Sequence, residues 1–107
     1  MEQQITVNTI LGQNSFKTKK LIGNLNSIII DTDSKIEIII ESENGYLIFH
    51  RKSIEGVYCL AIRNKVISSV ENTLDYLTFD KFLLDEHLII TVIGQANKEV
   101  NLIIKID

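Results

Sequence analysis

The chain has 107 residues, of which 45% are hydrophobic and 23% charged, and its formal net charge is −3. A chain of this length predicts one domain, residues 1–107, and its apolar content excludes a disordered segment. The acidic balance gives no positive field to attract a phosphate backbone, so we expect no nucleic-acid partner.

The sequence also limits where the protein works. Its single Cys cannot form an internal disulfide, which favours a reducing, cytoplasmic site of synthesis. The polar start, Met1-Glu2-Gln3-Gln4, is not typical of a signal peptide. Purely aliphatic runs reach only three residues, far below the roughly 20 that span a bilayer. We therefore expect a soluble chain with no membrane partner.

Residue composition predicts strands. There are 20 Ile, 6 Val and 7 Thr but only 2 Ala, and β-branched side chains fit a pleated surface better than a helix. Alternating apolar residues bounded by turn residues give the following predicted strands: 4–10, 17–22, 26–31, 35–42, 46–52, 57–63, 65–70, 87–94 and 99–106.

These elements predict an all-β fold: a single β-sandwich of about eight or nine strands, jelly-roll or immunoglobulin-like. The stretch 69–84 is the exception. Val70, Leu74 and Leu77 have helical spacing, and Thr78 could cap a following turn. One short helix or an ordered loop is expected there.

The clearest hairpin has Asn44-Gly45 at its turn, a pair that favours a two-residue type I′ loop. That loop would place Ile39 opposite His50 and Ile40 opposite Phe49. Alternation then predicts a core face that consists of Ile36, Ile38, Ile40, Ser42, Leu47, Phe49 and Arg51. The other face would hold an apolar centre framed by charge, including an opposed Glu37–Lys52 pair, and consisting of Ile39, Tyr46 and Ile48 with His50 beside them.

A second hairpin is expected between 88–93 and 100–106. It also places aliphatic residues, such as Ile89 and Ile103, on the face opposite its core residues. Polar-rimmed apolar patches of this kind commonly mark partner surfaces. Cover by other strands of the same chain and contact with another subunit both remain open.

Catalytic and metal motifs are weak throughout. Cys59 lies among apolar strand residues, which favours a small buried side chain over a reactive thiol. His50 and His87 lack partners at metal-ligand spacing, and Asp85-Glu86-His87 fits a solvated strand entry. Asp31-Thr32-Asp33-Ser34 starts like a calcium loop without its Gly and terminal Glu. The pair Glu41 and Glu43 falls on a hairpin tip. We expect no enzyme activity, cofactor or metal.

The C-terminal strands carry a family resemblance. Residues 82–94 (FLLDEHLIITVIG) and 97–107 (NKEVNLIIKID) resemble the closing strands of small all-β virion proteins of tailed bacteriophages, such as capsid decoration and head–tail accessory proteins. The resemblance covers about a quarter of the chain. It implies a non-enzymatic protein that binds a viral shell or tail in many copies, located in the virion after synthesis in the host cytoplasm.

The sequence therefore predicts a structural protein that binds other copies of itself or other virion proteins, as an oligomer or within a lattice. The candidate interface residues are Ile39, Tyr46, Ile48, His50, Ile89 and Ile103. Blocks of opposite charge along the chain would fix the register between neighbours. The alternative is a carbohydrate- or ligand-binding β module, which would need exposed aromatic residues on a sheet face.

Overall fold

Extended strands make up most of the protein, as its β-branched composition predicts. The computed structural model describes residues 1–68 and 76–107, and the side chains of 1–63 and 82–107. Its elements are β1 (Glu2–Asn8), the 3-10 turn η1 (Ile10–Gly12), β2 (Gln13–Lys17), β3 (Leu21–Ser42), β4 (Leu47–Leu60), β5 (Arg63–Ser68), β6 (Tyr76–Lys81), β7 (Leu83–Glu86), β8 (Leu88–Gly94) and β9 (Glu99–Ile106). The all-β fold class is confirmed.

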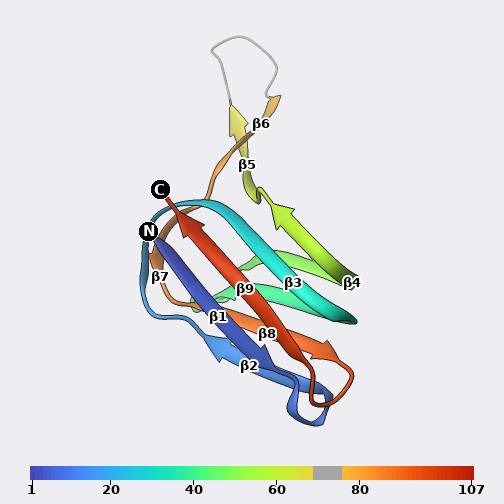
Figure 1. Ribbon diagram of the computed structural model, residues 1–107. Helices are drawn as coiled ribbons and strands as arrows, with labels where there is room; N and C mark the ends of the chain where they lie inside the picture. The colour runs from blue at the N-terminus through green and yellow to red at the C-terminus, as the bar shows by residue number, and fades with distance from the viewer. Residues whose placement is uncertain (69–75) are drawn as a thin grey trace.

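The long strand β3 organises the sheet, whose order is β1-β9-β3-β8-β2 (Figure 1). The first part of β3 pairs with β7 and β9, and its last part pairs with β8. β4 follows the opposite edge of β3 along both parts. We predicted two strands for 26–31 and 35–42 and two for 46–52 and 57–63. Each pair is instead one strand, because the ladder continues past bulges between Thr32 and Ile36.

The sheet curves until it nearly closes into a barrel. Its two edge strands, β1 and β2, approach each other next to η1, where the Asn14 Nδ2 donates to the Asn8 carbonyl oxygen at 2.8 Å. The two layers that the sequence places across the core are therefore two halves of one curved sheet. Between them lies a core of alternating residues from all these strands, including Ile5, Leu25, Ile28, Ile30, Ile38, Ile40, Leu84, Ile90, Leu102 and Ile104.

The predicted hairpin between 88–93 and 100–106 is wrong. The chain does reverse at 94–98, but β8 pairs with Ile36–Ser42 of β3, whereas β9 pairs with Leu25–Thr32. Because β3 bends between these two stretches, β8 and β9 follow different halves of it and separate. Ile89 and Ile103 consequently lie in different parts of the outer face.

The Asn44-Gly45 turn also differs from the prediction. The Gly45 N–H donates to Ser42 O at 3.0 Å and the Ser42 N–H donates to Tyr46 O at 2.9 Å, so the loop has three residues. Only Gly45 within it has positive φ, as in a type I turn followed by a G1 bulge. A second bulge after Ile40 restores the predicted pairing of Ile39 with His50.

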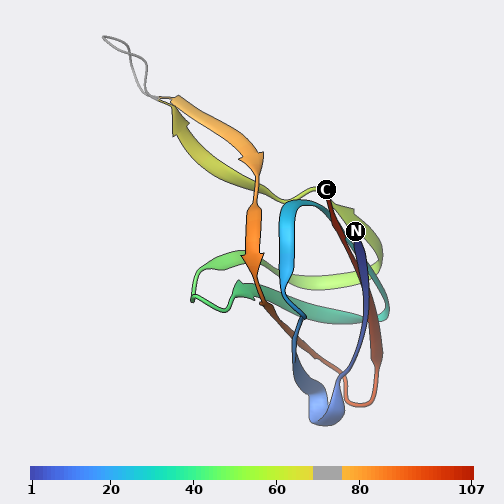
Figure 2. The same cartoon turned by 90° about the vertical axis from the view of Figure 1, so that its left-hand side faces the viewer.

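A two-stranded ribbon, β5 and β6, projects from this body (Figure 2). We call it the arm. Its register runs from Arg63 opposite Lys81 to Ser68 opposite Tyr76. The helix or loop expected over 69–84 is therefore wrong for 76–84, since cross-strand pairing of Thr78 with Val66 outweighs a weak helical spacing; residues 69–75 lie outside the described residues.

Candidate interaction surfaces

An apolar row crosses the outer face of the sheet. Register places Ile103 of β9 next to Ile29 of β3, and Ile29 next to Cys59 of β4. Their chain neighbours point inward to the core, so alternation turns these three residues outward. Val57, two positions before Cys59, is 70% exposed. We call Ile103, Ile29, Cys59 and Val57 the outer row.

The position of Cys59 corrects the sequence prediction of a buried side chain. Cys59 is exposed, because Tyr58 and Leu60 take the core-facing positions of β4. Bulges and positive φ angles at Ser53 and Gly56 set which residues of β4 face inward. The apolar neighbours of Cys59, on which the prediction of burial rested, do not reveal these irregularities.

A second apolar group lies on the outer face around β3 and β8. Ile39 and Ile89 are partly exposed there. Ile89 lies opposite Glu41, so Ile39, two residues before Glu41, is its diagonal neighbour on the same face. His50 lies opposite Ile39, and its Nε2 is 2.6 Å from the Glu37 Oε2. This contact replaces the predicted pair of Glu37 with Lys52. The structure thus brings together Ile39, His50 and Ile89 and leaves Ile103 in the outer row.

Ile48 does not lie on this surface. It is only 8% exposed and belongs to the core, while its neighbour Leu47 points outward. The cause is the bulge in the β3–β4 ladder, where the register changes between Ile40 and Glu41. This bulge shifts β4 by one residue near the turn. A shift of one residue moves a side chain to the other face of a strand. The prediction of Ile48 as an interface residue is therefore corrected.

Tyr46 is half-exposed, but its hydroxyl is engaged. It donates a short hydrogen bond to the carboxylate of Glu86, which also accepts from the Ser42 Oγ at 2.6 Å and the Asn44 Nδ2 at 2.9 Å. Glu86 is 5% exposed. The hydrogen bond to Glu86, with partial burial, raises the pKa of Tyr46 above its usual value. This carboxylate ties the 42–46 turn to the end of β7.

Glu86 is the residue that the sequence analysis missed, since we expected Asp85-Glu86-His87 to be a solvated strand entry. The only signal was the two-residue spacing of Leu84 and Glu86, which puts both on the inner face of β7. Next to it, the His87 N–H donates to the Glu43 carboxylate at 3.1 Å. That bond, together with the charges of His87 and Lys17, lowers the pKa of Glu43. Glu43 is thus a turn-stabilising group here.

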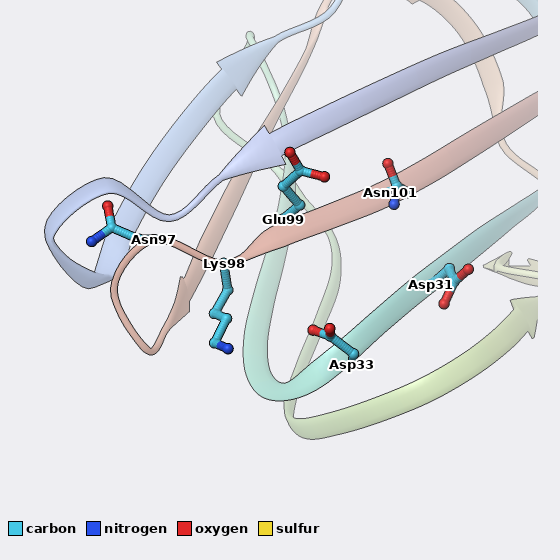
Figure 3. A pocket seen from close by; sticks show the side chains of 6 residues that line it. All are labelled: Asp31, Asp33, Asn97, Lys98, Glu99 and Asn101. Atoms are coloured by element: carbon cyan, nitrogen blue, oxygen red, sulfur yellow. The ribbon is translucent and has the colours of Figure 1, made fainter.

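A polar hollow of about 450 Å³ opens at the far end of β9 from the arm (Figure 3). It is lined by Asp31, Asp33, Asn97, Lys98, Glu99 and Asn101. Register pairs Asp31 with Asn101. The Thr9 hydroxyl donates to the Gln95 carbonyl oxygen and accepts from the Lys98 N–H, which fixes the other wall. Within the described residues, no three His, Cys, Asp or Glu side chains are grouped so that they could hold a metal ion.

The other candidate chemistry is dispersed. Tyr58 is half-buried, with the Arg51 guanidinium 5.4 Å from its ring centroid. His87 Nδ1 lies 2.7 Å from the Thr18 carbonyl oxygen, whereas His50 contacts Glu37, so the two imidazoles have different surroundings. These aromatic and imidazole groups therefore serve local packing and backbone contacts where the side chains are described.

Comparisons give no relative from which a role could be transferred. In the described part of the chain, no helix has the length and apolar character needed to cross a membrane. No protein-family model and no curated protein sequence matches the chain.

Proposed function

We propose that the protein is a non-enzymatic assembly protein that binds neighbouring protein subunits through the outward face of its sheet. The observation that carries this proposal is the outer row. Ile103, Ile29 and Cys59 lie side by side on three adjacent strands, and Val57 lies two residues before Cys59 on the same face of β4. Ile103 and Ile29 are partly exposed, and Cys59 and Val57 are exposed. Apolar groups arranged on an outward sheet face, with polar residues around them, favour a partner surface.

Polar residues lie at one end of the row and along one side of it. Gln4 of β1 pairs with Ile103 at one end, and the next row across the sheet holds Thr6, Asn101 and Asp31, with Val57 opposite Asp31. Apolar centres with polar rims are typical of protein–protein contacts. Fully burying a side chain such as Val or Ile contributes about 1.5–3 kcal/mol, and simultaneous binding to several neighbours multiplies the effect of each contact.

In its finer form, the proposal is that the partners are virion subunits, with the chain acting as a capsid decoration or head–tail component. The resemblance of its C-terminal strands to small phage virion proteins supports this form. The arm, β5 and β6, fits it as well, because a ribbon that leaves the body can reach a neighbouring subunit.

The test is the Val57→Asp substitution, measured by light scattering from micromolar to hundreds of micromolar protein. We expect the mass of the wild type to rise with concentration above its 12.2 kDa monomer, and Val57→Asp to weaken that association at least about tenfold. Val57 is exposed, so the variant keeps its fold, as circular dichroism would verify. Comparing how much wild type and how much Val57→Asp is incorporated into purified virus particles would test the proposal that the partners are virion subunits.

Leu47→Asp is the matched control, because it places the same charge at an exposed position of the same strand, at the end remote from the outer row. It should associate like the wild type. Equal association of wild type and Val57→Asp would contradict the outer row as the binding surface.

A further inference from the structure

The strand β4 lies at the margin of the sheet. It pairs with β3 along one edge, and among the described strands none pairs with its other edge (Figure 1). The backbone N–H and C=O groups on that side therefore bond water or another chain. Only an extended strand offers donors and acceptors at the matching spacing, which defines the chemistry of a partner for this edge.

The two parts of this edge differ in their protection against pairing. Over 47–56 the register with β3 shifts at bulges, and charged side chains are exposed at Arg51, Lys52 and Glu55. Over Val57–Leu60 the register is regular, and none of the four residues is charged. Proteins commonly block an exposed edge with bulges and charges. Val57–Leu60, which we call the free edge, has neither device.

The core-facing residues of the free edge are incompletely covered. Tyr58 and Leu60 pack against the core but stay partly exposed. Their cross-strand partners on β3, Ile30 and Ile28, are fully buried. The cause is that β3 has a paired strand on each side, whereas the described strands flank β4 on one side only. A strand added along the free edge would cover Tyr58 and Leu60.

The outward-facing residues of the free edge indicate what such a strand should carry. Val57 is exposed, and its partner on β3 is Asp31. Its apolar side chain therefore has a carboxylate on one side and the unpaired edge on the other. Cys59, on the same face, is exposed as well. A strand that sets a small apolar residue beside Val57 would bury both side chains without burying a charge.

We propose that the free edge pairs antiparallel with the free edge of a second copy, with Val57 opposite the partner's Cys59 and Tyr58 opposite the partner's Tyr58. The occupant is a second copy because a two-fold axis makes one strand complementary to itself: each hydrogen bond that one copy donates is also donated by the other. This register gives Val57 the small apolar neighbour that its own sheet does not supply. An axis through Cys59 would instead set Val57 against Ala61, which lies beyond the end of β4.

Pairing of this kind joins the two sheets. The order β1-β9-β3-β4 of one copy continues into β4-β3-β9-β1 of the other. Because the axis is perpendicular to the sheet, both outward faces lie on the same side, and the two outer rows share one surface. The inference rests on the proposed assembly function and deepens it, since a pair would present both rows together to its neighbours and bind them more tightly than one row alone.

The experiment tests the register by disulfide trapping. Val57→Cys adds a thiol that, in the proposed pair, lies directly opposite the partner's Cys59. Residues opposite each other in antiparallel strands have Cα separations of about 4.5–5.5 Å, which a disulfide spans. With oxidised glutathione as the oxidant, Val57→Cys should form a covalent dimer at least about tenfold faster than the wild type, whose two Cys59 thiols are diagonal neighbours beyond disulfide reach.

Two control variants separate this pairing from random collision. Leu47→Cys adds a thiol at an exposed position of β4 remote from the free edge, and Val57→Cys/Cys59→Ser keeps only the introduced thiol. Both should cross-link as slowly as the wild type, and circular dichroism would verify that each variant folds. Adding Ile103→Asp to Val57→Cys alters the outer row on β9, two strands from the free edge, and should leave the cross-link intact.

The inference is overturned if Val57→Cys cross-links no faster than the controls, or if the wild type cross-links as fast as Val57→Cys. It is also overturned if Ile103→Asp abolishes the cross-link, since the copies would then meet through their outer rows. In the first case the outer-row proposal is still decided by its own Val57→Asp test. A fast cross-link together with undiminished larger association of Ile103→Asp would support the free edge and contradict the outer row.

Discussion

The body and the arm differ in how many neighbours each strand has. In the body, β3 pairs with four other strands and places alternate side chains in a shared core. In the described residues of the arm, β5 and β6 pair only with each other. Backbone pairing is common to both regions, and in the body it is combined with a buried apolar face. Comparing the body with the arm distinguishes the packing that stabilises the fold from the surfaces that remain available for partners.

The largest expected effect is a loss of core packing in the body. Ile38 is fully buried in the middle of β3, opposite Val92 of β8. Ile38→Ala should lower the free energy of unfolding by about 2–5 kcal/mol, since it removes buried methyl groups and leaves a cavity. Urea unfolding measures this change. Ile22→Ala, the same substitution at an exposed position of β3, should change it by less than about 1 kcal/mol.

A smaller loss is expected from the buried carboxylate. Glu86→Gln keeps the shape but removes the charged acceptor of the Ser42, Asn44 and Tyr46 donors. Hydrogen bonds to charged groups contribute about 1.5–3 kcal/mol, so stability should fall by an amount within that range. The measurement is again urea unfolding, with Tyr46→Phe as the variant that removes only one donor. An unchanged unfolding midpoint for Glu86→Gln would mean that the carboxylate does not hold the turn.

The smallest effect on stability is expected from the arm itself. Replacing 64–80 by a short Gly-Ser turn joins Arg63 to Lys81, which already face each other. The unfolding free energy of the body should change by less than about 1 kcal/mol, because the body's core residues lie in its own strands. A loss as large as that of Ile38→Ala would show that the arm is part of the folding unit and would remove the contrast drawn above.

Alternation in the sequence was a reliable guide where the ladder is regular. Ile36, Ile38 and Ile40 are buried as predicted, and β9 has the predicted bounds, 99–106. The pairing of Ile39 with His50 is confirmed as well. Here each residue's face depends only on a period of two, which the sequence displays directly.

Prediction failed where bulges interrupt that period. The bulge near Ile40 buries Ile48 and exposes Leu47, and the irregular part of β4 exposes Cys59. A single extra residue inverts the face of each following residue until a second irregularity restores the register, and its position depends on hydrogen bonds with neighbouring strands. The prediction for Glu86 failed for the same reason, since its three hydrogen-bond donors lie 40 to 44 residues away in the chain.

The sequence by itself therefore determined the all-β class and the aliphatic core stripe of β3, because these depend on composition and local period. Only the tertiary structure decided that β3 bends, that β8 and β9 follow different halves of it, and that the arm leaves the body. Those features depend on which distant backbone groups satisfy each other's hydrogen bonds, and local sequence does not specify them. The candidate interaction surface arises from that second set, since register with β9 places Ile103 beside Ile29.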